Sequence, residues 1–264
     1  RDAMDERENE YTDDFVAAME LIWGDGFLSP GGTEELALFL DGVDLKGKEV
    51  LDVGCGIGGC DVALAGDYGA SHVLGIDIEQ PLLDRAAARA EQHGLSGLLS
   101  FKLVEPGPFP LEDASFDVVF SKDAMIHIED KHALFKEVFR VLRPGGLFVA
   151  SDWMRRDEEK PGPEAQRWLD VVGLTFGQHS PPFYVDALEK AGFTDIQTAD
   201  RNAFLCETLQ ADYDNLTGQY RLELARLAGE EMADHYTDVW HAALEAAQVG
   251  ELRPGHLRGT KPAD

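Results

Sequence analysis

The sequence that decides the fold runs from residue 49 to residue 59 and reads EVLDVGCGIGG. A short apolar run that ends in Asp52 is typical of a buried parallel strand, and the glycines after it let the backbone turn sharply against a ligand before a helix begins. Gly54, Gly56 and Gly59 also match the pattern G-x-G-x-x-G of nucleotide-binding loops. The stretch therefore predicts a strand, a ligand-binding turn and a helix.

A second acid closes the next expected strand, at residues 73–77. Asp77 follows the glycine loop at the distance from which an acid can hold the two hydroxyl groups of a ribose. That spacing suits both a dinucleotide such as NAD and S-adenosylmethionine (SAM). Asp52 favours SAM, because a carboxylate beside the loop repels a pyrophosphate and attracts a sulfonium or ammonium group. A glycine turn kept only for tight packing would explain the glycines but not two acids at consecutive strand ends.

Strand and helix patterns alternate along the rest of the chain. Further strands are expected at residues 98–104, 116–120, 147–151, 194–199 and 256–260, and helices at 81–93, 132–142, 184–191 and 208–249. The Pro and Gly residues of 143–146 are expected to end one of these helices, and residues 157–163 to form a loop. The alternation predicts an α/β fold with a Rossmann-like, seven-stranded, mainly parallel sheet and helices on both faces. Ligands of such sheets bind at the carboxyl ends of the strands.

Two helices are expected before the first strand, one over residues 11–23 and one that begins near Thr33. This segment lies outside the alternation of the sheet, so we expect it to cross the strand ends as a helical lid and to bring Tyr11 and Ser29 near the ligand. The length of 264 residues suits one α/β core. The expected organisation is a single domain, 1–264, made of a lid (1–40), a SAM-binding core (41–200) and C-terminal helices with the last strand (201–264).

The acidic composition limits the partners of the protein. A net charge of −27 argues against nucleic acid and anionic membranes as partners, which need clustered Lys and Arg, and suits a surface that stays soluble at high salt. No stretch approaches the ~20 apolar residues of a membrane span, and residues 1–8 lack the basic and apolar regions of a signal peptide. Three cysteines without metal-ligand spacing indicate reduced thiols, no metal and a cytoplasmic setting. We expect a monomer or a homodimer.

Further motifs carry a family resemblance. The glycine loop, the sequence GIDI at 75–78, Phe116-Asp117 and the sequence VLRPGG at 141–146 resemble the class I SAM-dependent methyltransferases. More narrowly, segments 11–13, 27–32 and 121–127 resemble the phosphoethanolamine N-methyltransferases, and segment 183–193 is similar to the sarcosine and dimethylglycine N-methyltransferases. The resemblance covers roughly residues 10–200.

The resemblance implies SAM as the cofactor and a set of residues around it. The residues that would contact SAM are Leu28, Ser29, Asp52, Gly54, Gly56, Asp77, Ile78, Glu105 and Ser121. Among them, Glu105 is longer than the aspartate that the family usually places beside the adenine.

The resemblance also implies Tyr11 and His127 as a catalytic pair and Asp123 as the residue that holds the substrate amine. Methyl transfer needs a neutral amine lone pair in line with the sulfonium–methyl bond, so a base must remove the proton of the amine. His127 can accept that proton if Tyr11 orients its ring. The alternatives are a structural histidine at His127 and a helix cap at Asp123.

The acceptor end departs from the pattern of the phosphobase enzymes. Trp153, Leu174 and Phe176 stand where those enzymes place tyrosines and an arginine, and Ala243 stands near their late lysine. A buried phosphate dianion needs paired donors, so we expect an amine with a carboxylate or with no anion. Trp153, Phe176 and Tyr184 can surround a methylated ammonium by cation–π contact, or they can be core and pocket wall.

These observations lead to a specific expectation of function. We expect an N-methyltransferase that acts on sarcosine or dimethylglycine towards glycine betaine, an osmolyte. Phosphoethanolamine or another small molecule is the alternative acceptor. An NAD-linked oxidoreductase is disfavoured by Asp52, and a catalytically silent SAM-binding module is disfavoured by the combination of Tyr11, Asp123 and His127.

Overall fold

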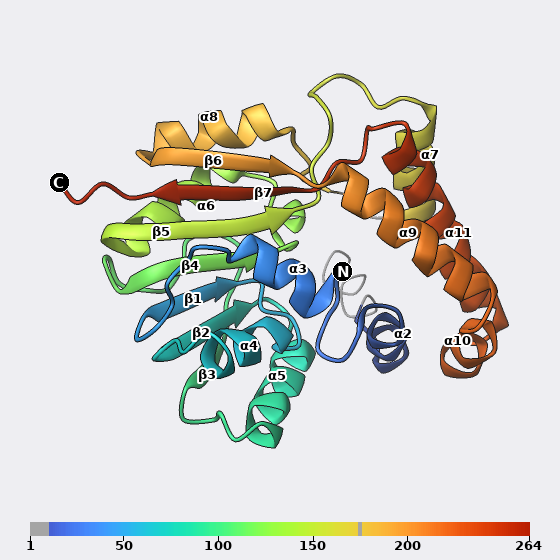
Figure 1. The fold of residues 1–264 in the computed structure, drawn as a ribbon, viewed down its shortest axis with the longest axis horizontal. Helices are drawn as coiled ribbons and strands as arrows, with labels where there is room; N and C mark the ends of the chain where they lie inside the picture. Colours follow the sequence, from blue (N-terminus) through green and yellow to red (C-terminus); the bar gives the residue numbers. More distant parts are fainter. Residues whose placement is uncertain (1–10, 174–175) are drawn as a thin grey trace.

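The computed structural model describes residues 11–173 and 176–264. Within these residues, seven strands form one sheet in the order β3-β2-β1-β4-β5-β7-β6 (Figure 1). The strands are β1 (Glu49–Val53), β2 (His72–Asp77), β3 (Leu99–Leu103), β4 (Phe116–Lys122), β5 (Leu142–Asp152), β6 (Thr194–Asp200) and β7 (Gly255–Thr260). Strands β1 to β5 pair in parallel, and β7 lies antiparallel between β5 and β6. The expected Rossmann-like, mainly parallel sheet is confirmed.

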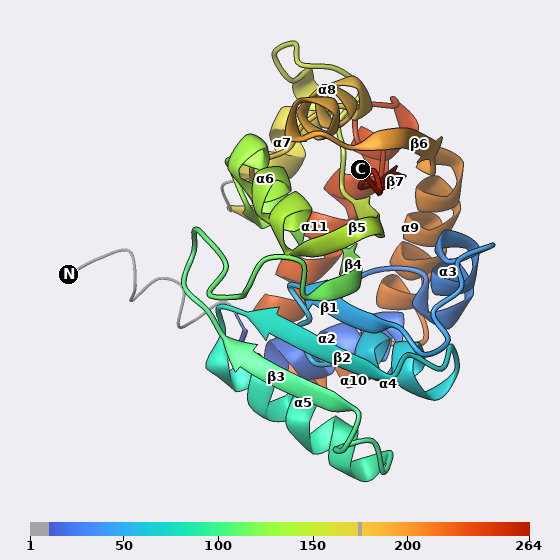
Figure 2. The ribbon, with the colours of Figure 1, turned by 90° about the vertical axis from the view of Figure 1, so that its left-hand side faces the viewer.

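Helices cover both faces of the sheet, because its central strands are apolar on both sides. The helices are α2 (Asp13–Trp23), α3 (Gly32–Phe39), α4 (Gly59–Gly66), α5 (Gln80–Gln92), η1 (Met125–His127), α6 (Lys131–Val141), α7 (Pro163–Val172), α8 (Pro181–Ala191), α9 (Asn202–Thr217), α10 (Arg221–Ala228) and α11 (Glu230–Gln248). On one face, α3, α4 and α5 bury Leu36, Leu64 and Ala90. On the other face, α6 and α8 bury Phe135 and Leu188, and Figure 2 shows α6 opposite α3 and α4 across the sheet.

A third group of helices lies beyond the carboxyl ends of the parallel strands (Figure 1). This helical cover consists of α2, α7, α9, α10 and α11, which share one apolar cluster that includes Met19, Trp168, Leu209 and Trp240. Helix α2 comes from the expected lid and the others from the second half of the chain. The cover places its side chains over the edge of the sheet where ligands of this fold bind.

Three boundaries differ from the expectation. The sequence RPGG does not separate α6 from β5, because the strand begins at Leu142 and runs through Gly145, whose φ is +81°. The expected helix at 208–249 is three helices, with breaks at Gly218 and Gly229. The expected loop at 157–163 ends in Pro163, which opens helix α7.

The sequence has no stretch long and apolar enough to span a membrane, and the structure agrees for the residues that it describes: none of their helices has both the length and the apolar character that crossing a bilayer would require.

Candidate active site

The glycine loop joins β1 to α4 at the carboxyl edge of the sheet. Gly54, Gly56 and Gly58 have φ values of +75°, +55° and +84°, a region that side chains disfavour. A Cβ atom at Gly54 would lie 2.3 Å from the Cβ of Ala124. Only glycine therefore lets the loop pass so close to the segment that follows β4. The same turn directs the N-terminus of α4 towards the expected ligand.

Asp77 lies at the end of β2 beside this loop. Its Oδ2 accepts a hydrogen bond from the backbone N–H of Gly56 at 2.9 Å, and its Oδ1 accepts one from that of Glu79 at 3.1 Å. Burial raises the pKa of Asp77, and these backbone bonds oppose the rise. Each carboxylate oxygen can accept more than one bond, so Asp77 can still hold the hydroxyl groups of a ribose.

Apolar side chains are exposed next to Asp77. Ile78 is 42% exposed, and Leu103, which is the register partner of Asp77 on β3, is 49% exposed. Burying these side chains against a flat aromatic base would be favourable, so the surface fits an adenine. Leu103 was not predicted, and Glu105 is exposed two residues further along the chain.

Asp52 lies near the end of β1, beside the glycine loop, and its expected contact with the cofactor stays a prediction. It is 2% exposed and interacts with Asp61 in the first turn of α4, which is fully buried. Within the described part of the chain, Oδ1 of Asp52 and both carboxylate oxygens of Asp61 accept no hydrogen bond. Burial raises the pKa of Asp61 to about 7, and burial together with the charge of Asp61 raises that of Asp52 well above its usual range. Because these raised pKa values favour the neutral carboxyls, a cationic cofactor beside them would stabilise their ionised form.

The loop between α2 and α3 lies on the glycine loop, as the lid prediction requires. A Cβ atom at Gly56 would lie 3.4 Å from Cδ1 of Leu28. The hydroxyl of Ser29 accepts a hydrogen bond from Nζ of Lys122 at 2.5 Å, and the carbonyl of Pro30 accepts another at 2.9 Å. The structure thus brings Leu28 and Ser29 to the expected cofactor site and adds Lys122, which was not predicted.

Asp123 follows β4 with an unusual backbone conformation, a φ of +54°. Its Oδ1 accepts a hydrogen bond from the hydroxyl of Ser151 at 2.9 Å, and its Oδ2 lies 3.1 Å from Nζ of Lys122. The residue does not cap a helix, since Ala124 is the N-cap of η1 and Asp130 caps α6. The alternative of a capping role is therefore wrong.

His127 lies at the end of η1 with its ring against Phe176, at 5.6 Å between ring centroids. Burial and the charge of Lys131 lower its pKa, so its neutral form, which can accept a proton, predominates at pH 7. Lys131 is 1% exposed and donates hydrogen bonds to the carbonyls of Met125 at 2.8 Å and Gly177 at 2.6 Å. This buried lysine fixes η1 against the segment that carries Phe176.

Tyr11 lies at the start of the lid. Its ring contacts Phe15 edge to face at 5.6 Å and packs on a small cluster that includes Ile57 and Leu82. Tyr11 therefore lies near the glycine loop, and its pairing with His127 stays a prediction.

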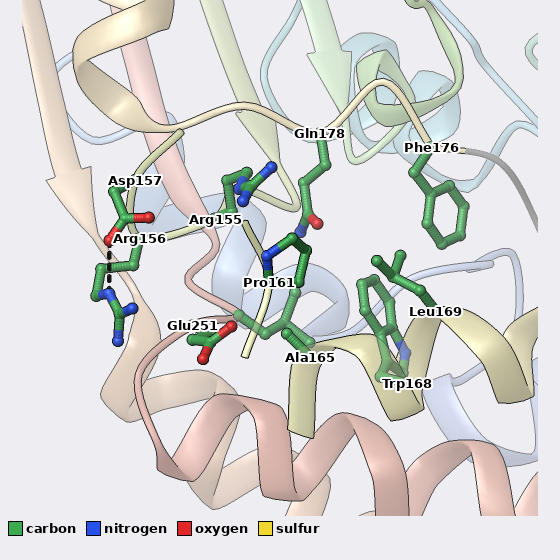
Figure 3. Close-up of a pocket in the computed structure, with 11 residues that line it drawn as sticks. Arg155, Arg156, Asp157, Pro161, Ala165, Trp168, Leu169, Phe176, Gln178 and Glu251 are labelled. Carbon is green, nitrogen blue, oxygen red and sulfur yellow. Dashed lines mark hydrogen bonds and ion pairs between the residues drawn. The ribbon is translucent and has the colours of Figure 1, made fainter. Parts of the chain in front are cut away.

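A stack of aromatic rings extends from His127 into the cover. Trp153 and Trp168 are 6.4 Å apart with an interplanar angle of 19°, and Trp168 and Phe176 are 5.4 Å apart at 21°. Trp168, which was not predicted, stacks on both Trp153 and Phe176, and the expected box around a methylated ammonium stays a prediction. Trp168 and Phe176 also line a pocket of about 80 Å³ together with Gln178 (Figure 3).

Two residues that were predicted to contact a ligand have their side chains buried in the core. Tyr184 is 0% exposed and its hydroxyl donates a hydrogen bond to Asp152, so it belongs to no cation box. Ser121 is 1% exposed and its hydroxyl donates to the carbonyl of Val53 at 2.8 Å. Both hydroxyls hold core elements together.

Four positions were expected to lack the phosphate-binding side chains of the phosphobase enzymes: Trp153, Leu174, Phe176 and Ala243. Leu174 lies outside the described residues. Ala243 is buried in α11 and brings no donor to the site. Trp153 and Phe176 contribute ring faces instead of hydroxyl groups.

Comparison with known proteins places the chain in a family. A family model described as a methyltransferase domain matches residues 44–179. A phosphoethanolamine N-methyltransferase of Triticum aestivum is 35% identical over 247 residues, which are 93% of this chain and 48% of that protein. The chain thus spans about half the length of this relative.

Solved structures share the fold. A Haemonchus contortus phosphoethanolamine N-methyltransferase 2, in complex with phosphomonomethylethanolamine and S-adenosylhomocysteine, superposes with a TM-score of 0.87 at 25% identity over 96% of this chain and 59% of that one. A putative sarcosine dimethylglycine methyltransferase from Galdieria sulphuraria superposes with a TM-score of 0.74 at 24% identity over 88% of this chain and 84% of that one. Since the family model also covers just over half of the 264 residues, the chain belongs to the methyltransferase domain family, as a SAM-dependent methyltransferase of the class I fold.

Proposed function

We propose that the protein transfers a methyl group from SAM to the nitrogen of a small amine whose other end carries a carboxylate rather than a phosphate, with sarcosine or dimethylglycine as the acceptor. The observation that carries the choice of acceptor is the stack of Trp153, Trp168 and Phe176 beside His127. A phosphate dianion buried against ring faces without paired donors would cost several kcal/mol. A carboxylate carries less charge and needs fewer donors.

The chemistry follows from the positions of two side chains. SAM supplies an electrophilic methyl group on a sulfonium. Asp123 accepts a hydrogen bond from the acceptor amine and orients its lone pair. His127, held neutral by burial, takes the proton that the ammonium form of the acceptor must lose before it can attack. The nearby rings exclude water from this end of the site.

A second acceptor, phosphoethanolamine, is favoured by the relative at 35% identity, which carries that name. The likeness to the putative sarcosine dimethylglycine methyltransferase, at 24% identity, is a likeness of fold alone and does not decide between the acceptors. The two acceptors differ in the anionic group at the end away from the amine, which is a carboxylate in one and a phosphate in the other. They can therefore be separated by kinetics.

The test compares kcat/KM for sarcosine, dimethylglycine and phosphoethanolamine at saturating SAM. We expect phosphoethanolamine to react at least ~100-fold less efficiently than the better of the two carboxylates, the scale of one lost charged contact. The double variant Trp153→Tyr and Phe176→Tyr restores two hydroxyl donors and should narrow this ratio. Equal kcat/KM on phosphoethanolamine in the parent protein refutes the carboxylate proposal, and no methylation of any of the three amines refutes the proposed function.

A further inference from the structure

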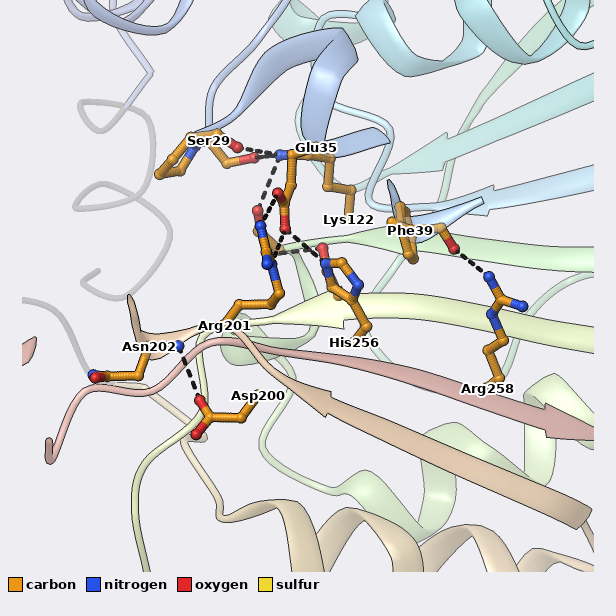
Figure 4. A network of polar contacts seen from close by, with 12 residues as sticks. Ser29, Glu35, Phe39, Lys122, Asp200, Arg201, Asn202, His256 and Arg258 are labelled. Carbon is orange, nitrogen blue, oxygen red and sulfur yellow. Dashed lines mark hydrogen bonds and ion pairs between the residues drawn. The ribbon is translucent and has the colours of Figure 1, made fainter. Parts of the chain in front are cut away.

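Lys122 occupies the junction between the lid and the acceptor site. Its side chain is 4% exposed at the end of β4. Its ammonium group donates hydrogen bonds to Oγ of Ser29 at 2.5 Å (Figure 4), to the carbonyl oxygen of Pro30 at 2.9 Å and to Oδ2 of Asp123 at 3.1 Å. A buried ammonium is costly unless its donors are satisfied, so these contacts hold the charge in one place.

Asp123 can bind an acceptor while this ion pair persists. An ionised carboxylate has about four lone-pair sites, and two of them are taken by Lys122 and by the hydroxyl of Ser151. The backbone is also fixed, since the N–H of Asp123 donates to the carbonyl of Ser151 at 2.8 Å. When the amine binds, the negative charge of Asp123 is therefore already balanced by Lys122.

The protonation of a bound amine depends on this balance. A carboxylate without a counter-ion favours the ammonium form of the acceptor, which has no lone pair and cannot attack the methyl group. A cation 3.1 Å from the carboxylate opposes that preference. Opposite charges at such distances move a pKa by roughly one to three units.

Other ionisable groups face the pair from the elements around it. They are Cys60 on α4, Asp152 on β5 and, from the side of α3, Glu35 with Arg201 and His256. Glu35 already contacts Arg201 and the ring of His256, and Asp152 accepts hydrogen bonds from Tyr184 and from the backbone of Ile126. Over residues 11–173 and 176–264, Lys122 is thus the side chain that forms an ion pair with Asp123.

We propose that Lys122 is a positioning residue for the reaction: by balancing the charge of Asp123, it weakens the hold of the site on the ammonium form, so that the bound amine loses its proton to His127 and becomes nucleophilic. The inference rests on the proposed function in that Asp123 holds the amine. It is independent of whether the far end of the acceptor is a carboxylate or a phosphate.

The test measures the pH profile of kcat at saturating SAM in Lys122→Met and Lys122→Arg. The acceptor is whichever of dimethylglycine and phosphoethanolamine the parent methylates faster, so a wrong acceptor class leaves the test intact. In Lys122→Met we expect kcat at pH 7 to fall about tenfold, the midpoint of the profile to move up by about one pH unit, and KM for the amine not to rise. Lys122→Arg keeps the charge and should retain the parent midpoint.

Controls separate this role from a structural one. SAM affinity measured by calorimetry reports whether each variant retains its cofactor site, and Lys136→Met, at an exposed position on α6, serves as the matched control. A loss of kcat that is equal at every pH, an unchanged profile in Lys122→Met, or the same shift in Lys122→Arg would each overturn the proposal.

A measurement on the parent protein decides the matter if Lys122→Met does not fold. The acidic midpoint of its kcat profile should lie at least about one pH unit below the pKa of the free amine in solution, measured by titration. A midpoint at or above that pKa overturns the proposal.

Discussion

Replacing Glu35 with glutamine should loosen α3 from the C-terminal half of the chain. Glu35 lies on α3 with a side chain only 7% exposed, and it receives hydrogen bonds from the guanidinium of Arg201 at 2.8 and 2.7 Å (Figure 4). Nε2 of His256 lies 2.7 Å from the same carboxylate. The network therefore joins α3 to the start of α9 and to β7.

The magnitude follows from the protonation of this carboxylate. Burial raises the pKa of Glu35, but the bonds from His256 and Arg201 outweigh it and lower the pKa from 4.5 to about 2. One pKa unit corresponds to about 1.4 kcal/mol, so the ionised network contributes roughly 3 kcal/mol. Because the folded pKa is depressed, this contribution is present above pH ~4.5 and is lost as the pH falls through about 2.

Urea unfolding at pH 7 and pH 3 measures the effect, with Glu34→Gln as the control. Glu34 is exposed on the same helix and loses the same charge. We expect Glu35→Gln to lower the free energy of unfolding by roughly 3 kcal/mol at pH 7 and by less at pH 3. Hydrogen exchange should show faster opening of the α3 amides. A loss at pH 7 within about 0.5 kcal/mol of that of Glu34→Gln would contradict the reasoning.

Three further predictions concern the cofactor, the base and the cover. Asp77→Ala should weaken SAM about ten- to a hundredfold by calorimetry, since two ribose hydroxyls lose their acceptor; unchanged affinity would show that the loop is misread. His127→Ala should lower kcat by ~10²–10⁴ with SAM affinity within about threefold of the parent, and a loss of SAM affinity with kcat intact would exclude it as the base. Burial raises the pKa of Asp212, which accepts hydrogen bonds from Trp23 and Trp240, to about 6. Because this pKa is raised in the folded state, the parent loses stability as the pH rises from ~4 through 6. Asp212→Asn, which cannot ionise, should therefore have a free energy of unfolding roughly 2 kcal/mol above that of the parent at pH 8 and a smaller advantage at pH 4. An equal difference at both pH values would refute this.

Local patterns in the sequence were enough to predict the sheet. The run at 73–77 became β2, His72–Asp77, and the expected last strand became β7. The direction and position of β7 could not be predicted, because they depend on pairing with β5, as between Leu147 and Thr260, far away in the sequence. Trp168 was missed for a local reason: Pro163 was read as the end of a loop, whereas proline is also favoured in the first turn of a helix.

Some side chains in the site could not be placed from the sequence because the face on which they lie depends on tertiary packing. Asp52 was expected to meet the ligand, and the sequence could not show that the buried carboxyl of Asp61 on α4 lies beside it. The roles of Lys122 and Lys131 could have been suspected from the sequence. One lysine ends an apolar strand and the other lies four residues after His127, and a lysine that is buried at such a position needs acceptors for its protons. Only the folded chain shows that these acceptors are Ser29 and Asp123 for one lysine and backbone carbonyls for the other.

The position of β7 has a consequence for the order in which the chain can fold. Residues 201–254, which carry α9, α10 and α11, are inserted between β6 and β7, the two strands of one antiparallel pair. At translation rates of roughly 5–20 residues per second, ribosomes need several seconds for about fifty residues. During that time β5 is an unpaired sheet edge, which is prone to association with other chains, and β6 has no neighbour. The nascent protein should therefore depend on chaperones until β7 emerges, and truncation before Gly255 should give aggregation rather than a smaller folded enzyme.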